Sequence, residues 1–325
     1  MLMMKKDKVL YLYLYLYRVV SLILLLLVSM PGVAGGLSPM TMNFDDGGSA
    51  IYYSFDKSIT SPGDVVGPIK NLIFVIAGSG CGSMGRFLPE YFTGLEGESG
   101  RTRIFVLQKR FIAEMADGQK CSDDFVRADH ISQWHVDQLK FIRARLAEID
   151  VATGRVVLLG ISEGAELVPL IAADLPQVTH MALLSHSGMN AGRVYHALAA
   201  DYPHMARGWQ ELQTVLASRP ADPDGVSIHS RSWRYWKEIL DLPETESLLA
   251  SKLPILLGAG GADRLIPAHS LDQLRHQFIE AGNDHLRILQ YPLADHGLMG
   301  PTHNYLPDFM WQLDLWLSES KTLTP

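Results

Sequence analysis

The chain has 325 residues, of which 47% are hydrophobic and 19% charged, and its formal net charge at pH 7 is -7. A chain of this length can bury a core large enough to need no metal or disulfide staple. The mildly acidic balance and the lack of a long basic run exclude the electrostatic footprint of a nucleic-acid-binding protein. We therefore expect no nucleic-acid partner.

The first 35 residues have the order of a secretory signal peptide. Lysines come first, the apolar run VVSLILLLLVSM follows at 19–30, and small residues at 31–36 offer a cleavage site. The run is shorter than the roughly 20 apolar residues that cross a bilayer. An uncleaved anchor is the alternative, because residues 9–17 are also apolar, and membrane contact would then come only through this segment. We predict an exported protein, periplasmic or secreted, with one folded domain at 36–325.

Strand-like and helix-like segments alternate along that domain. Strands are predicted at 50–55, 72–77, 104–108, 156–159, 178–184, 255–258 and 286–291. Helices are predicted at 130–149, 163–174, 271–281 and 306–317. This order predicts an α/β fold, with a mostly parallel sheet flanked by helices on both faces.

One segment, residues 188–251, interrupts the alternation. It has no clear strand, and its aromatic residues include Trp209, Trp233, Tyr235 and Trp236. A long insertion between strands of a parallel sheet is usually functional. We predict a helical cap over the carboxyl ends of the strands, and a peripheral helical decoration is the alternative.

A serine stands between two glycines where a strand is expected to become a helix, in Gly160-Ile161-Ser162-Glu163-Gly164. Glycines on both sides of the serine leave room for a sharp turn, which pushes the serine hydroxyl out above the sheet. The pattern G-x-S-x-G is typical of a nucleophile elbow. An ordinary glycine-rich turn is the alternative. We predict that Ser162 is a nucleophile.

A serine nucleophile needs a base, and that base must be held by an acid. With an elbow of this kind, the acid and then the histidine follow the serine in the sequence. Asp263 follows the strand at 255–258, and His296 follows the strand at 286–291. In a parallel sheet, these two loops and the elbow all lie at the carboxyl ends of the strands. We therefore predict a catalytic group of Ser162, His296 and Asp263.

Other residues compete for these roles. Asp295 adjoins His296, but neighbours in sequence rarely orient each other's rings, and we expect Asp295 to cap a turn or face solvent. Among the 12 histidines, His285 begins a strand and so lies at the wrong edge of the sheet, and His303 is a further rival. His186 precedes the acid in sequence and is better suited to lining a pocket than to acting as the base.

Acyl transfer also needs N–H donors for the oxyanion that forms on the substrate. One donor is expected to be the backbone N–H of Glu163, directly after the nucleophile. The loop after the strand at 72–77 reads AGSGCGSMG, and its glycines allow close approach to a ligand. We predict the N–H of Ser79 as the second donor, with Gly80 as the second choice. A phosphate-binding loop is the alternative, but the Lys-Ser/Thr ending of a P-loop is missing.

The chain has two cysteines, Cys81 and Cys121. In an oxidising compartment such a pair is more often bridged than free. Closing a loop of about 40 residues contributes roughly 4 kcal/mol in the chain-entropy model. We predict a disulfide that holds the oxyanion loop in place, and two buried thiols are the alternative.

Metal and cofactor chemistry find little support in the sequence. His130 and His135 are five residues apart and do not share a helix face, and the motifs H-E-x-x-H and H-x-H do not occur. No clear dinucleotide fingerprint is present. We expect neither a metal nor a cofactor.

The chain resembles the α/β-hydrolases over roughly residues 40–320. The resemblance rests on GISEG, the GSGCGS loop, GGADRLIP and ADHGL, and it is closer to the dienelactone hydrolases and prolyl-oligopeptidase-type catalytic domains. One departure is Ala77-Gly78, where many members have His-Gly, so we expect the hydrogen bonding of this loop to differ. The resemblance implies a metal-independent serine hydrolase with esterase, lipase, thioesterase or peptidase activity.

We therefore expect an exported serine hydrolase that cleaves a carboxylic ester through an acyl-enzyme intermediate. The Trp- and Met-rich insertion favours a small-molecule acyl substrate with an apolar part. A peptidase or amidase using the same three residues is one alternative. A hydrolase fold that binds a partner without turnover is another, although the complete set of three residues argues against it.

Overall fold

The computed structural model describes residues 37–59, 67–149 and 154–319. The segment for which a signal peptide is predicted lies outside the described residues. Across the described ranges, no helix combines the length and apolarity that crossing a bilayer requires.

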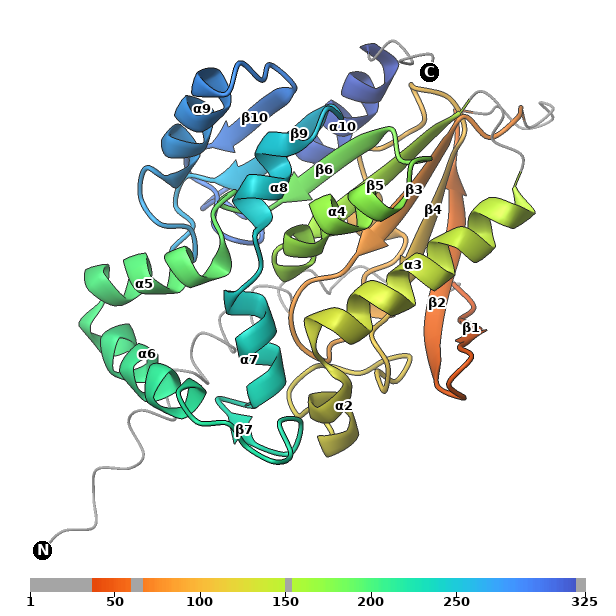
Figure 1. Cartoon of the computed structure of the whole chain (residues 1–325). Coiled ribbons are helices and arrows are strands. Elements are labelled where there is room, and N and C mark those ends of the chain that lie inside the picture. The colour runs from red at the N-terminus through yellow and green to blue at the C-terminus, as the bar shows by residue number, and fades with distance from the viewer. Residues whose placement is uncertain (1–36, 60–66, 150–153, 320–325) are drawn as a thin grey trace, which may run out of the picture.

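An eight-stranded sheet forms the centre of the molecule, in the order β1-β2-β4-β3-β5-β6-β9-β10 (Figure 1). The strands are β1 (Met40–Asn43), β2 (Ser49–Lys57), β3 (Asn71–Ile76), β4 (Thr102–Leu107), β5 (Arg155–Ile161), β6 (His180–Leu184), β9 (Ile255–Gly260) and β10 (Leu286–Tyr291). Neighbours from β4 to β10 run parallel, whereas β1 and β2 are added antiparallel at one edge. The mostly parallel α/β sheet predicted from the sequence is confirmed.

Helices cover both faces of this sheet. They include α3 (Ile131–Glu148), α4 (Glu163–Asp174), α8 (Glu244–Ala250), α9 (Ser270–Glu280) and α10 (Leu306–Glu319). Along β3, Phe74 packs in a cluster with residues of α3, α4, α8 and α9, and Val75 packs in the opposite cluster with residues of α10. Every residue of β3 is buried, because a central parallel strand is covered on both sides.

Asp314 fixes α10 to the loop that precedes β4. Its side chain is fully buried. The carboxylate accepts the backbone N–H groups of residues 96–99 at 2.7–3.0 Å and the Ser99 hydroxyl at 2.6 Å. A buried carboxylate is costly unless its acceptors are filled, and here five donors fill them.

Residues 188–251, which we call the cap, lie between β6 and β9. They contain α5 (Ala191–Asp201), α6 (Pro203–Leu216), α7 (Trp233–Leu240), α8, and a hairpin of β7 (Ser227–Ile228) and β8 (Arg231–Ser232). The sequence indicated no strand here, because two-residue strands are too short to show alternation.

The aromatic residues of the cap pack mainly against one another. Tyr195 stacks on Trp209 with ring centroids 6.2 Å apart, and its ring meets Trp236 edge-on at 5.5 Å. The Trp236 indole N–H donates to the carbonyl of Ile228 at 2.8 Å. These rings therefore hold the helices and the hairpin of the cap together.

Candidate active site

The turn between β5 and α4 has the geometry of a nucleophile elbow. Ser162 lies between the two elements with φ 52° and ψ -122°, a conformation that a residue with a side chain rarely adopts. A Cβ on Gly160 would lie 2.4 Å from a Cα of α4, and one on Gly164 would lie 2.1 Å from a carbonyl oxygen of β3. Both positions therefore require glycine, which explains the spacing in the sequence.

Ser162, His296 and Asp263 form a continuous hydrogen-bonded row. The serine Oγ lies 2.8 Å from His296 Nε2, and His296 Nδ1 lies 2.7 Å from Asp263 Oδ2. The Asp263 carboxylate is completely buried, whereas 22% of the imidazole is exposed. The second oxygen of Asp263 accepts the Leu265 N–H at 2.8 Å. An Nδ1–H donated to the carboxylate leaves Nε2 free to accept the serine proton.

The loops after β9 and β10 bring Asp263 and His296 to the elbow. Asp263 follows the end of β9 by three residues, and His296 follows β10 after a short turn. Asp295 accepts two backbone N–H groups of this turn, each at 2.9 Å, and so shapes the loop that carries the histidine. The rival His303 instead pairs with Asp308 at the surface, at 2.7 Å.

Backbone N–H groups are available beside Ser162. A Cβ on Gly78 would lie 3.5 Å from the Cβ of Ser162, so the loop after β3 passes directly against the serine. Among the described residues, no acceptor is bonded to the N–H of Ser79 or of Gly80. The N–H of Glu163 is the first of α4 and has no intrahelical acceptor. The positive end of the helix dipole also favours an anion here.

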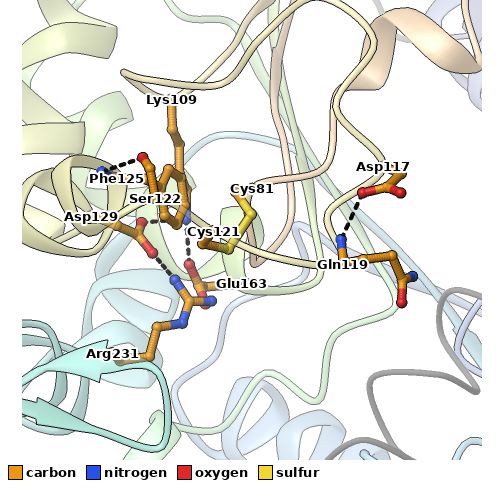
Figure 2. The surroundings of a disulfide bond; sticks show 10 residues. All are labelled: Cys81, Lys109, Asp117, Gln119, Cys121, Ser122, Phe125, Asp129, Glu163 and Arg231. Atoms are coloured by element: carbon orange, nitrogen blue, oxygen red, sulfur yellow. Dashed lines mark hydrogen bonds and ion pairs between the residues drawn. A yellow bond between two sulfur atoms is a disulfide. The ribbon is translucent and has the colours of Figure 1, made fainter.

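A disulfide joins Cys81 in this loop to Cys121, with the two Cα atoms 5.5 Å apart (Figure 2). Cys121 lies just before α2 (Asp123–Ala128), a six-residue helix too short to be predicted from its sequence. The Ser83 N–H also donates to the carbonyl of Ala116 at 2.9 Å. The glycine-rich loop is therefore fixed both covalently and by hydrogen bonds.

The side chain of Glu163 belongs to a buried polar network that sequence reasoning missed. Its carboxylate lies 2.7 Å from Lys109 Nζ and 2.5 Å from the Tyr235 hydroxyl. Burial lowers the pKa of Lys109 to about 8, an effect that the Glu163 carboxylate opposes and the Arg231 charge reinforces. Only the backbone of Glu163 was assigned a role from the sequence, because these partners are more than 50 residues away.

A second buried cluster joins Glu166 of α4, His186 after β6 and Glu244 of α8. His186 Nε2 lies 3.3 Å from a Glu166 oxygen, and its Nδ1 lies 3.3 Å from a Glu244 oxygen. Potential ligand atoms of the three residues lie within 4.8 Å of one another, near enough to surround a metal ion. The Gly188 N–H donates to Nδ1 at 2.9 Å, which leaves Nε2 to carry the imidazole proton. Burial and the neighbouring Glu166 charge raise the pKa of Glu244 well above its usual range. A proton shared between Glu244 and Glu166 can therefore reduce the negative charge of this cluster.

The sheet order, the elbow and the hydrogen-bonded row beside it define an α/β-hydrolase of the serine hydrolase class. The family model described as "BAAT / Acyl-CoA thioester hydrolase C terminal" matches residues 145–317, which is more than half of the chain. The protein belongs to this family. No curated protein matches the sequence.

Solved structures agree on the fold. The superposition on an open form of a lipase covers 87% of this chain and 100% of the lipase chain, with a TM-score of 0.57 and 13% sequence identity. Est1E from Butyrivibrio proteoclasticus covers 87% of this chain and 99% of its own, with a TM-score of 0.55 and 12% identity. The acylaminoacyl peptidase of Pyrococcus horikoshii covers 92% of this chain but 45% of its own, with a TM-score of 0.53 and 13% identity.

Proposed function

We propose that the protein is an exported serine esterase in which Ser162 is the nucleophile, His296 the general base and Asp263 the residue that orients the base. The observation that carries this proposal is the row of hydrogen bonds at 2.8 and 2.7 Å that ends on the positive-φ serine of the elbow. A serine, an imidazole and a buried carboxylate in this order are what acyl transfer requires.

In the proposed reaction, Ser162 Oγ attacks the carbonyl carbon of an ester while His296 Nε2 takes the hydroxyl proton. Asp263 holds the Nδ1–H and stabilises the imidazolium that forms. The imidazolium then gives its proton to the departing alkoxide, and an acyl-enzyme remains. Water, deprotonated by the same imidazole, attacks the acyl-enzyme and releases the acid and the free serine.

The negative oxygen of each tetrahedral intermediate would be held by the N–H of Glu163 and the N–H of Ser79, with Gly80 as the alternative donor. Their support is the lack of a bonded acceptor, among the described residues, on either loop N–H, together with the place of Glu163 as the first residue of α4. Losing one such donor typically costs roughly 3–4 kcal/mol of barrier height.

An ester with an apolar acyl or alcohol part is the proposed substrate. The lipase and the esterase Est1E among the similar structures favour this choice. The family description names acyl-CoA thioester hydrolases, which makes a thioester the second candidate. A thioester would react through the same groups, because the carbonyl carbon and the developing oxyanion occupy the same positions. An amide, suggested by the acylaminoacyl peptidase, is the third.

Export is supported by the order of residues 1–35 and by the disulfide between Cys81 and Cys121. Structural disulfides persist in oxidising compartments and are rare where thiols are kept reduced. We propose a periplasmic or secreted location on these two grounds.

The test is hydrolysis of three substrates that share a butyryl group: p-nitrophenyl butyrate, S-butyrylthiocholine and butyryl-p-nitroanilide. We expect kcat/KM to be highest for the oxygen ester and at least tenfold lower for the anilide. The highest value on the thioester would move the assignment to a thioesterase, and the highest on the anilide to an amidase. No turnover of any of the three by folded protein would contradict catalysis.

A further inference from the structure

The side chain of Glu163 is 8% exposed, although its residue adjoins the nucleophile. Its carboxylate accepts three hydrogen bonds, from Lys109 Nζ at 2.7 Å, from the Tyr235 hydroxyl at 2.5 Å and from Arg231 Nη2 at 3.3 Å. Charge-assisted hydrogen bonds from three directions hold a carboxylate in one orientation. The conformation of residue 163 is therefore set by its side chain as well as by the helix that it begins.

The three donors come from separate parts of the fold. Lys109 follows β4 by two residues, Arg231 lies in β8, and Tyr235 lies in α7. The last two belong to the cap. The Glu163 carboxylate thus joins the elbow to the loop after β4 and to the cap.

Asp129 completes the network with the opposite charge. It accepts from Lys109 Nζ at 2.8 Å and forms an ion pair with Arg231 (Figure 2). The two cations, Lys109 and Arg231, and the two anions, Asp129 and Glu163, therefore neutralise one another, and their side chains are only 2–13% exposed. Buried ion networks add little to stability relative to apolar replacements, so stability alone gives a weak reason for this arrangement.

The network and the disulfide are connected through α2. Cys121 precedes this helix, and Asp129 is the residue at its C-terminal cap. The loop that carries Ser79 is bridged to the start of α2, while the elbow that carries Glu163 is ion-paired to its end through Lys109. Both expected oxyanion donors are therefore attached to the same short helix.

We propose that Glu163 is a positioning residue whose buried carboxylate fixes its own backbone N–H and ties the position of that N–H to the seated cap. This inference rests on the proposed function, because it assumes that the N–H holds the oxyanion. Oxyanion donors act only when they stand about 3 Å from the developing charge, and a displacement of 1 Å can cost on the order of a hundredfold in rate. A cap that moves away removes two of the three donors that hold the carboxylate.

The network also predicts that the reaction rate depends on pH through the protonation of Lys109. The charged groups that face its ammonium are Asp129, Glu163 and Arg231. Arg110 and Asp137, which pair with each other at 2.7 Å, line the same small hollow, and the Trp134 ring lies 3.9 Å from Nζ. With a pKa of about 8, Lys109 loses its charge above that pH and holds Glu163 less firmly. The reaction rate should therefore fall as the pH rises from 8 to 10.

The experiment compares Glu163→Gln, Tyr235→Phe and Lys109→Arg with the wild-type full-length protein. The readouts are the second-order rate of labelling by a fluorophosphonate, and kcat and KM for p-nitrophenyl butyrate, from pH 6 to pH 10. Glu238→Gln is the matched control. Glu238 also joins the cap helix α7 to the core, through the Ser132 N–H at 2.7 Å and its hydroxyl at 2.8 Å, but it does not touch the elbow.

We expect Glu163→Gln to lower the labelling rate and kcat by about 10- to 100-fold with KM changed less than threefold. Tyr235→Phe should lower both by about threefold to tenfold, and Glu238→Gln by less than twofold. Lys109→Arg keeps its charge, so its rate should stay level between pH 8 and pH 10 where the wild-type rate falls.

Three results would overturn the inference while leaving the proposed function intact. The first is a wild-type labelling rate in both Glu163→Gln and Tyr235→Phe. The second is a loss of labelling rate and kcat in Glu238→Gln as large as that in Glu163→Gln. The third is a fall in rate between pH 8 and pH 10 in Lys109→Arg that is identical to that of the wild type. If Glu163→Gln fails to fold, Tyr235→Phe and the pH profile of Lys109→Arg decide the question. A wild-type protein that is not labelled at all would instead refute the proposed function.

Discussion

Replacing Asp263 by asparagine should nearly abolish activity without unfolding the protein. The Leu265 N–H donates to one oxygen of the carboxylate at 2.8 Å, and His296 Nδ1 lies 2.7 Å from the other. An asparagine must turn its carbonyl oxygen toward the Leu265 N–H, since its amide would meet another donor there. Its NH₂ group then faces Nδ1.

An NH₂ donor beside Nδ1 forces the imidazole proton onto Nε2. In that tautomer Nε2 cannot accept the Ser162 proton. The loss of orientation and of imidazolium stabilisation together amounts to about 10⁴-fold in kcat, or about 5.4 kcal/mol of barrier. Hydrolysis of p-nitrophenyl butyrate, with thermal unfolding as the check on folding, measures this loss.

Asp295→Asn is the matched control for this experiment. Its carboxylate lies next to the histidine in sequence but accepts both of its N–H groups through one oxygen, which asparagine retains. We expect less than a threefold change in kcat. A folded Asp263→Asn protein that keeps more than a tenth of the wild-type kcat would refute the assignment of the acid.

Three further predictions concern stability. Asp314→Asn turns one filled acceptor into a donor facing backbone N–H groups, so the free energy of unfolding should fall by about 2–4 kcal/mol in urea titrations; an unchanged midpoint would contradict this. The pKa of Glu244 is raised in the folded state. The protonated Glu244 therefore contributes fully to the free energy of unfolding below its unfolded-state pKa, and this contribution is lost as the pH rises through its folded-state pKa. Glu244→Gln imitates the protonated form and should therefore raise the free energy of unfolding at pH 7, with no gain near pH 4; an equal effect at both pH values would contradict a shared proton with Glu166. Replacing both Cys81 and Cys121 by alanine should lower the free energy of unfolding by up to roughly 4 kcal/mol, the value for a closed loop of about 40 residues, and a melting temperature that does not change would refute that contribution.

Much of the fold could be predicted because the central strands and helices carry local signals. β3 and β5 are continuous apolar runs buried on both faces, and α4 has the bounds that the sequence indicates. β1 could not be found in this way, since its four residues are mostly exposed and are held by pairing with β2. The same holds for the hairpin of the cap, whose strands have two residues each.

The candidate site was predictable where its residues follow strand ends. Ser162, Asp263 and His296 each lie just beyond the carboxyl end of a strand, so strand order alone brings them to one edge of the sheet. The network around Glu163 was not predictable, because Lys109 and Tyr235 meet it only through the folding of the cap onto the core. The position of Lys109, two residues after a buried strand, was the one available signal.

Whether Ser162 is an activated nucleophile is decided by labelling the purified protein with a fluorophosphonate, with wild type beside Ser162→Ala and mass spectrometry as the readout. We expect a single adduct on the wild type, located at Ser162, and none on the variant. An adduct on both proteins, or on neither when both are folded, would contradict Ser162 as an activated nucleophile.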